Sequence, residues 1–153
     1  MPPSAIDLRR GRVSEIGRIY LITAVTLDRV PLFEDLALAR TTIAHLHHAD
    51  AHGRSKTLAW VLMPDHLHWL VQLADGELSR LVAGFKAGSA SSINRILQTP
   101  GQRRWQTGFH DHALRTEEDI AAIARYVIAN PLRAGIVTSV RAYPHWDTVW
   151  LPE

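Results

Sequence analysis

The sequence predicts an α+β fold in which an antiparallel sheet is covered by helices on one face. Three observations support this prediction: short β-branched runs alternate with stretches of helical periodicity, a Pro-Asp turn joins two of the runs, and no linker divides the 153 residues. The expected order is β-α-β-β-α-β-α. Its first six elements match the split β-α-β, ferredoxin-like pattern, and residues 1–153 are predicted to form one domain.

The first half of the chain is expected to contain three strands and one helix. Residues 19–27, IYLITAVTL, are β-branched and apolar, which is typical of a strand. Residues 32–53 carry apolar side chains at helical spacing and end at a glycine. Residues 57–63 and 66–73 are predicted strands, and the Pro-Asp pair between them indicates a hairpin.

The second half is expected to add two helices and one strand. Residues 75–98 follow helical periodicity, and residues 105–115 read as an extended segment or a fourth strand. Thr116 with Asp119 three residues later forms a capping-box pattern, so a helix is predicted to begin at Thr116. This helix should not continue past Asn130, because a proline follows it. The C-terminal tail has little regular pattern.

Composition and charge narrow the class of protein. The chain has no cysteine, which excludes disulfides and cysteine-based zinc sites. It shows no signal-peptide core and no apolar run near the ~20 residues of a membrane helix, so we expect a soluble, cytoplasmic protein. The formal net charge is only +2, but arginine clusters could bind phosphate groups. The clustered arginines are Arg9, Arg10, Arg12, Arg103 and Arg104.

A histidine pair stands out in the third predicted strand, within AWVLMPDHLHWLVQL. Because side chains alternate along a strand, His66 and His68 should share one face, while Leu67 and Trp69 face the core. The two Cα atoms should then lie roughly 6–7 Å apart. Both rings could bind one metal ion or one phosphate, or they could simply be surface histidines.

One tyrosine falls on a predicted helix. Asp119, Ala122, Tyr126 and Asn130 line a narrow stripe beside the core stripe, so Tyr126 and Asn130 could face the same site. The alternative is that Tyr126 packs at the rim of the core and that Asn130 opens the next turn.

Taken together, these motifs resemble the HUH-superfamily single-strand DNA endonucleases, and in particular the REP-associated tyrosine transposases. MPDHLHWLV is similar to the His-hydrophobe-His motif of the superfamily. WQTGFHDHALRTEEDIAAIARYVIANPLRAGIV resembles the C-terminal block of the REP-associated branch, and LRRGRVSEIGRIYLITAVT resembles its first strand. The resemblance covers most of the chain and implies the HUH endonuclease fold.

The resemblance implies a role for each matching residue. His66 and His68 correspond to the metal-binding pair, Tyr126 to the nucleophile, and Asn130 to a third metal ligand. The implied ion is Mg²⁺ or Mn²⁺. The chain departs from the family at Asp65, where asparagine is common, and we expect Asp65 to serve the turn.

The implied activity is that of a metal-dependent, sequence-specific single-stranded DNA endonuclease and strand transferase. It would act on REP-type hairpins through a 5′-phosphotyrosine intermediate, as a monomer or homodimer associated with a bacterial nucleoid. A tyrosine hydroxyl is a poor nucleophile until deprotonated, and a divalent cation offsets that weakness.

Several side chains are candidates for DNA contacts. The candidates for phosphate binding are Arg80, Lys86, Arg95, Arg103, Arg104, Arg115 and Arg133. Trp69 and Trp105 could stack bases. His110 and His112 form a second His-x-His motif. His112 could support the metal site or contact the DNA, or it could have only a structural role.

Two other functions fit the same residues. One is a non-catalytic, single-stranded nucleic-acid-binding module of ferredoxin-like fold. The other is a simple metallohydrolase in which Tyr126 only packs. A covalent tyrosine–DNA adduct would separate the transposase from both alternatives.

Overall fold

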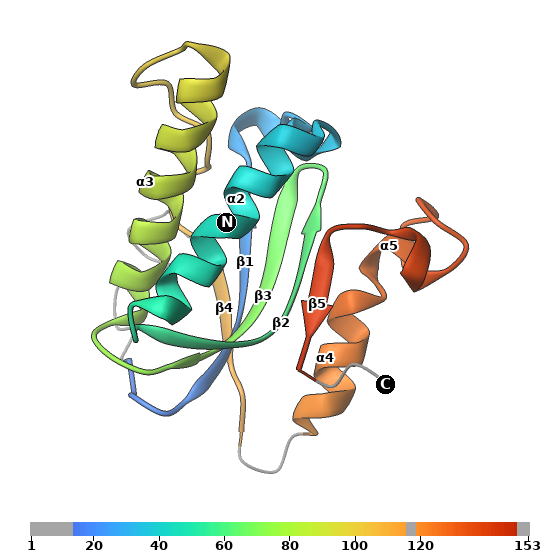
Figure 1. Ribbon diagram of the computed structural model, residues 1–153. Coiled ribbons are helices and arrows are strands. Elements are labelled where there is room, and N and C mark those ends of the chain that lie inside the picture. The colour runs from blue at the N-terminus through green and yellow to red at the C-terminus, as the bar shows by residue number, and fades with distance from the viewer. Residues whose placement is uncertain (1–13, 116–118, 150–153) are drawn as a thin grey trace, which may run out of the picture.

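A five-stranded antiparallel sheet runs through the centre of the protein, with its strands in the order β4-β1-β3-β2-β5 (Figure 1). The computed structural model describes residues 14–115 and 119–149. The strands are β1 (Ile19–Val25), β2 (Ser55–Met63), β3 (His66–Leu73), β4 (His110–Ala113) and β5 (Trp146–Thr148). The order of the first four is that of a ferredoxin-like sheet, which confirms the predicted α+β fold class.

Four α-helices and three short 3₁₀ turns accompany the sheet within the described ranges. The helices are α2 (Leu36–Ala51), α3 (Leu78–Leu97), α4 (Ile120–Ile128) and α5 (Asn130–Arg133), and the turns are η1 (Leu27–Arg29), η2 (Leu32–Glu34) and η3 (Val140–Ala142). None of these helices is long and apolar enough to cross a membrane.

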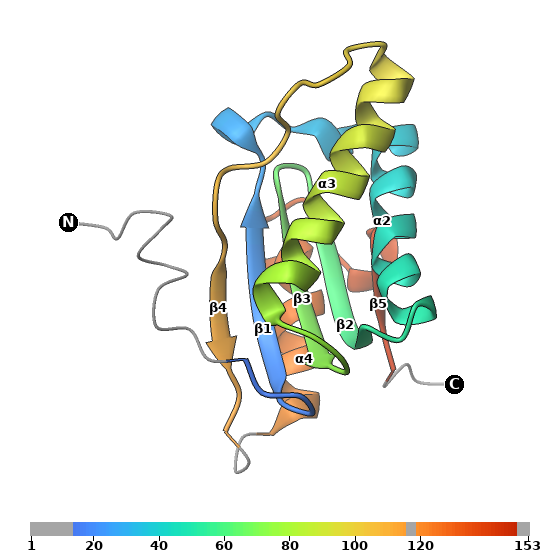
Figure 2. The ribbon, with the colours of Figure 1, turned by 90° about the vertical axis from the view of Figure 1, so that its left-hand side faces the viewer.

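Helices α2 and α3 cover one face of the sheet, as predicted (Figure 2). Between them and the sheet lies the main core, which Tyr20 and Ile22 of β1 enter together with Trp69 of β3. The Trp69 indole donates to Thr57 Oγ1 at 3.0 Å, and the buried Trp105 indole donates to Ser89 Oγ at 3.0 Å. The interpretation of Trp69 and Trp105 as base-stacking residues is therefore wrong, because both rings fill the core.

The opposite face of the sheet carries α4, whereas the sequence predicted helices on one face only (Figure 2). Ala124 of α4 packs against Leu58, Ala59 and Leu70, while Val127 packs in a separate small cluster. The helix covers this face mainly along β2. Leu70 of β3 and the partly buried Ile19 and Leu21 of β1 belong to the same apolar cluster as Ala124.

Two predicted helix starts are corrected by the capping contacts. Helix α2 begins at Leu36 because the Asp35 carboxylate accepts the backbone N–H of Leu38, so the preceding apolar residues form η2 instead. Helix α4 begins at Ile120 because the Asp119 carboxylate accepts the backbone N–H of Ala122. Thr116 lies outside the described residues, as do the arginines of the N-terminal cluster, Arg9, Arg10 and Arg12.

The C-terminal tail adds a strand that the sequence did not predict. Strand β5 pairs with the free edge of β2. Just before it, the buried Tyr143 hydroxyl donates to the Leu62 carbonyl of β2 at 2.5 Å. Burial raises the pKa of Tyr143 to about 12. The C-terminal tail is thus held against β2 by the backbone pairing of β5 and by the hydrogen bond of the buried Tyr143 hydroxyl.

Helices α2 and α3 meet where the His45 ring lies over Gly88. A Cβ atom added to Gly88 would lie 2.6 Å from His45 Nδ1, and the ring is held there by a 2.8 Å hydrogen bond to Ser92. We expect Gly88→Ala to lower the free energy of unfolding by about 1 kcal/mol, because an overpacking cost of ~1–3 kcal/mol exceeds the ~1 kcal/mol gain in helix propensity. Urea unfolding measures this difference.

The matched control is Gly84→Ala on the same helix. Its added Cβ would meet only Arg54 Nη1, at an ordinary 3.6 Å, so this variant should be as stable as the wild type or more stable. Adding His45→Ala to Gly88→Ala should remove most of the penalty. Equal stability of the two alanine variants would contradict the proposed steric contact.

The raised pKa of Tyr143 predicts that the free energy of unfolding depends on pH in alkaline solution. Its folded-state pKa lies above the ordinary value of about 10, so its stabilising contribution is complete below pH 10 and is lost as the pH rises from about 10 to 12. Tyr143→Phe should cost ~1 kcal/mol at neutral pH, and the gap to wild type should shrink above about pH 10. Urea unfolding of both proteins across this range tests it; a constant gap would argue against the buried hydrogen bond.

Candidate functional site

The histidine pair lies on central strand β3, on the face opposite α2 and α3. The neighbouring Leu67 and Trp69 have no accessible surface, so strand alternation turns His66 and His68 to the other side, as predicted. The two imidazole centroids are 4.8 Å apart, and the ring planes are nearly perpendicular at 86°. Both rings are partly buried, and they are close enough to bind a single ion.

A carboxylate orients His66. Its Nδ1 lies 2.7 Å from Asp65 Oδ1, and since a carboxylate only accepts, Nδ1 must donate. Nε2 then keeps its lone pair on the far side of the ring. Burial by itself raises the pKa of Asp65, but the hydrogen bond and charge of His66 and the Arg29 guanidinium, 3.3 Å away, outweigh burial and lower it. Asp65 therefore orients His66 as well as serving the turn.

A threonine of the adjacent strand contacts His68. Thr23 of β1 lies directly across from His68, and its Oγ1 is 3.0 Å from His68 Nδ1. When Nδ1 donates to this oxygen, Nε2 of His68 is also left with a lone pair. The pKa of His68 is lowered to about 4. Burial is the largest cause, and the charges of His66 and Arg133 add to it. The ring is therefore neutral at neutral pH and suited to bind a cation.

Helix α4 packs beside this pair. Val61 and Met63 of β2 are the cross-strand partners of His68 and His66, and Val127 of α4 packs in one cluster with both. The helix therefore rests on the strand positions next to the two imidazoles. Tyr126 of α4 precedes Val127 directly, and Asn130 opens the following helix α5.

The two predicted site residues of the C-terminal block have side chains outside the core. Tyr126 is 64% exposed, which argues against a packing role for its ring. Asn130 is partly exposed, and its Nδ2 donates to the Val127 carbonyl at 2.9 Å, which leaves Oδ1 as its accepting atom. An amide oxygen oriented in this way is a suitable ligand for a hard divalent cation.

Arg133 connects Tyr126 with the histidine pair. Its guanidinium carbon lies 3.6 Å from the centroid of the Tyr126 ring, and Nη1 donates to the Tyr126 carbonyl at 2.6 Å. Its charge also acts on His68. Arg133 was a candidate for DNA contacts, and of those candidates it is the one with such links to this site.

A cation at this site would depend on donors other than acidic side chains. Among residues 14–115 and 119–149, no group of three or more His, Cys, Asp or Glu residues could hold a metal ion. The donor set that the resemblance implied, two imidazole nitrogens and the Asn130 oxygen, is neutral and would leave coordination positions for oxygen atoms of a substrate or water.

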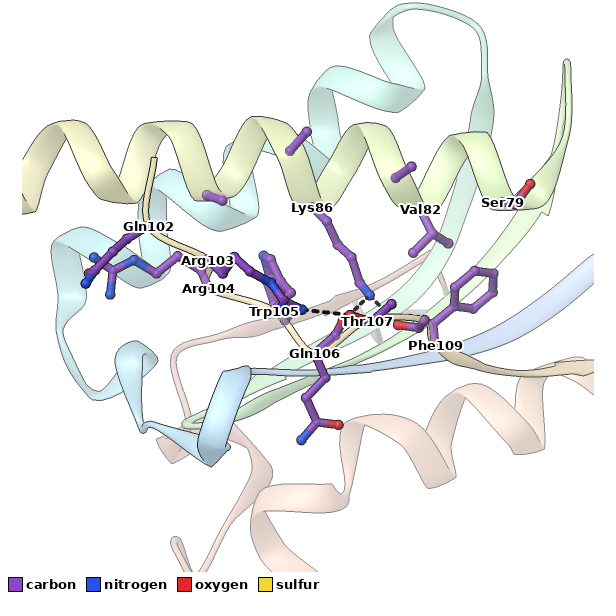
Figure 3. A pocket seen from close by; sticks show the side chains of 14 residues that line it. Ser79, Val82, Lys86, Gln102, Arg103, Arg104, Trp105, Gln106, Thr107 and Phe109 are labelled. Carbon is purple, nitrogen blue, oxygen red and sulfur yellow. Dashed lines mark hydrogen bonds between the residues drawn. The ribbon is translucent and has the colours of Figure 1, made fainter. Parts of the chain in front are cut away.

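Lys86 and Arg104, two of the basic candidates, are held by contacts between α3 and the segment that follows it. The Lys86 ammonium donates to the backbone carbonyls of Gln106 and Gly108 (Figure 3). Arg104 donates to Asn94 Oδ1 at 2.7 Å and to Thr99 Oγ1 at 2.6 Å. These bonds anchor residues 102–109 to α3, and a hollow of about 420 Å³ lies between the two segments.

The remaining basic candidates are exposed. Arg80 and Arg95 lie on α3, on the far side of the sheet from the histidine pair, and Arg115 follows β4. Arg103 lines the hollow of Figure 3 and donates to Thr107 Oγ1 at 2.7 Å.

The second histidine motif lies on the edge strand β4. His112 pairs with Leu21 and His110 with Thr23, so both histidines share the sheet face of the first pair. His110 occupies the cross-strand row that contains Thr23 and His68, whereas the predicted supporting residue, His112, lies one row away.

Sequence reasoning missed Thr23 and His110 as neighbours of the site. The alternation of β1 could have placed Thr23 on the same sheet face as the pair. The pairing register that sets Thr23 beside His68 depends on strands far apart in the chain, so no local pattern encodes it.

Comparison with known proteins identifies the family. The profile of the IS200-like transposase family matches residues 17–130, a span that contains the histidine pair, Tyr126 and Asn130. A solved structure of a REP-associated tyrosine transposase bound to a REP hairpin superposes with a TM-score of 0.72, at 20% identity, over 88% of this chain and 79% of that chain. That likeness supports the fold.

Two curated relatives support the same assignment. A Haemophilus influenzae protein assigned as a REP-associated tyrosine transposase is 25% identical over 139 residues, which is 84% of this chain and 78% of that protein. The REP-associated tyrosine transposase of Escherichia coli is 28% identical over 87 residues, or 56% of this chain and 50% of that protein. The resemblance found in the motifs is confirmed, and the chain belongs to the IS200-like transposase family of enzymes.

Proposed function

We propose that this protein is a metal-dependent, sequence-specific endonuclease and strand transferase for single-stranded DNA, built on a single domain. The observation that carries the proposal is the pair of imidazoles whose Nδ1 atoms are engaged by Asp65 and Thr23. With both Nδ1 atoms engaged and the ring centroids 4.8 Å apart, the two Nε2 atoms would be available to one cation, on the sheet face against which α4 packs through Val127.

The residues present fit a divalent cation. His66 and His68 would bind it through Nε2 and Asn130 through Oδ1, with Mg²⁺ or Mn²⁺ as the ion. A bound cation supplies Lewis-acid stabilisation of a phosphate oxygen and fixes its orientation.

The proposed reaction is a transesterification at a DNA phosphate. The Tyr126 hydroxyl loses its proton to water and its oxygen attacks the phosphorus, while the bond from phosphorus to the 3′ oxygen breaks and that oxygen takes up a proton. The products are a 5′-phosphotyrosine and a free 3′-OH. Since one phosphate ester replaces another, a different 3′-OH can reverse the step and join strands.

The proposed substrate is a REP-type DNA hairpin. The REP-associated relative of known structure was solved with such a hairpin, and the exposed arginines of this chain offer phosphate contacts. Arg80, Arg95, Arg103 and Arg115 are the candidates with exposed side chains away from the histidine pair.

The nucleophile is tested with labelled single-stranded oligonucleotides that carry REP-type hairpins. In Mn²⁺ or Mg²⁺, the wild type should form a covalent protein–DNA band on denaturing gels, and a chelator should abolish it. Tyr126→Phe should lose adduct formation by ~10⁴-fold or more while still binding DNA, because its ring is exposed and the fold does not depend on the hydroxyl.

Histidine variants complete this experiment. His66→Ala and His68→Ala should lose the adduct, whereas His52→Ala, at the exposed C-cap of α2, should retain it. Cleavage without an adduct that survives Tyr126→Phe would indicate a metallohydrolase. Binding without cleavage of any strand would indicate a non-catalytic module.

The hydrogen bonds behind the pair predict metal affinity. Thr23→Val and Asp65→Asn each remove or weaken a partner of Nδ1, so each should weaken Mn²⁺ binding by about 10-fold or more. Titration followed by electron paramagnetic resonance measures this without requiring activity. Thr41→Val on α2 is the control, and an equal Mn²⁺ affinity of all four proteins would count against the metal site.

A further inference from the structure

We infer that Arg133 is a positioning residue that clamps the nucleophile Tyr126 in place, an inference that rests on the proposed function. Arg133 lies beyond the part of the chain that the family profile matches, which ends at residue 130. Its guanidinium contacts the ring and the backbone carbonyl of Tyr126, whereas a side chain that only binds DNA phosphates would extend into solvent.

Arg133 contacts Tyr126 at two points. The guanidinium lies against the ring face, 3.6 Å from its centroid, and Nη1 donates to the carbonyl of the same residue at 2.6 Å. One contact fixes the guanidinium relative to the backbone of α4, and the other uses it to restrain the ring. Only a planar, forked cation can make both contacts at once.

The Tyr126 ring needs such a restraint. At 64% exposure it is not held by core packing, and an unrestrained tyrosine exchanges between staggered χ1 rotamers. In-line attack on a phosphate would require one defined direction of the hydroxyl, and so one rotamer. A misplacement of about 1 Å in a reacting group can cost ~10²-fold in rate, so a clamp on the ring has a large effect on attack.

The break between α4 and α5 places the clamp. The buried Pro131 sits in the first turn of α5, and the Arg133 N–H bonds to the Ala129 carbonyl at 3.0 Å. Asn130 and Arg133, three residues apart, lie on neighbouring positions of this short helix. The short helix α5 therefore carries both Asn130, the proposed amide ligand of the cation, and Arg133, whose guanidinium contacts the nucleophile Tyr126.

Packing relates the clamped tyrosine to the histidine pair. Val127, the residue after Tyr126, packs in one cluster with Val61 and Met63, which are the cross-strand partners of His68 and His66. The residue that Arg133 contacts is therefore the direct neighbour in sequence of the residue that packs beside the proposed cation site.

The test separates adduct formation from DNA affinity. Arg133→Met should lower the single-turnover rate of adduct formation at saturating DNA by about 10²-fold, with little change in affinity. Arg133→Lys keeps the charge but not the planar fork, so it should recover only part of that rate. Arg125→Met removes the exposed arginine next to Tyr126 and should leave the rate unchanged.

A second readout does not require activity. Nitration of Tyr126, followed by mass spectrometry, should be several-fold faster in Arg133→Met, because the guanidinium no longer covers one ring face. Thermal unfolding of each variant shows that the fold is intact.

The outcomes distinguish the clamp from the proposed function. If the wild type forms no adduct but Arg133→Met speeds nitration of Tyr126, the clamp stands and the transesterification fails. If the adduct forms and Arg133→Met changes neither rate nor nitration, the clamp is wrong. A loss of DNA affinity with a salt slope smaller by about one, at an unchanged saturated rate, would make Arg133 a phosphate contact instead.

Discussion

Leu67 and Trp69 are completely buried, and their burial fixes the direction of every other side chain on β3. A strand offers only two faces, and a slip of one residue would exchange them. With the apolar residues held under α2 and α3, the imidazoles of His66 and His68 have to face the other way. The whole site depends on this constraint, since Thr23, Val61 and Met63 come beside the imidazoles through the register of the same strand.

The hairpin and its histidine pair could be predicted because their signals are local. Alternation along residues 66–73 and the Pro-Asp turn are both contained within a few residues of the chain. The predicted stripe that joins Tyr126 and Asn130 on one helix is interrupted, because α4 ends at Ile128 and Asn130 begins α5. Strand β5 was missed because three residues carry too little pattern, and its pairing with β2 depends on residues some 85 positions earlier in the chain.

Basic residues show the limit of sequence reasoning most clearly. Lys86 and Arg104 look like any other cation along the chain, yet both are engaged by oxygen atoms that hold residues 102–109 against α3. Arg95, which lies on α3 as Lys86 does, is exposed. The difference lies in non-local partners such as Asn94 and the Gln106 carbonyl, so a count of arginines overstates the charge that a nucleic acid can reach.

Both borders of the sheet are short. The β4 ladder has four residues and β5 has three, whereas the inner strands have seven to nine. An edge strand with a long row of unpaired N–H and C=O groups invites another sheet to add to it, and short edges limit that growth. The brief outer strands therefore protect the protein against edge-to-edge aggregation, while the long inner strands stay available to hold the histidines rigidly.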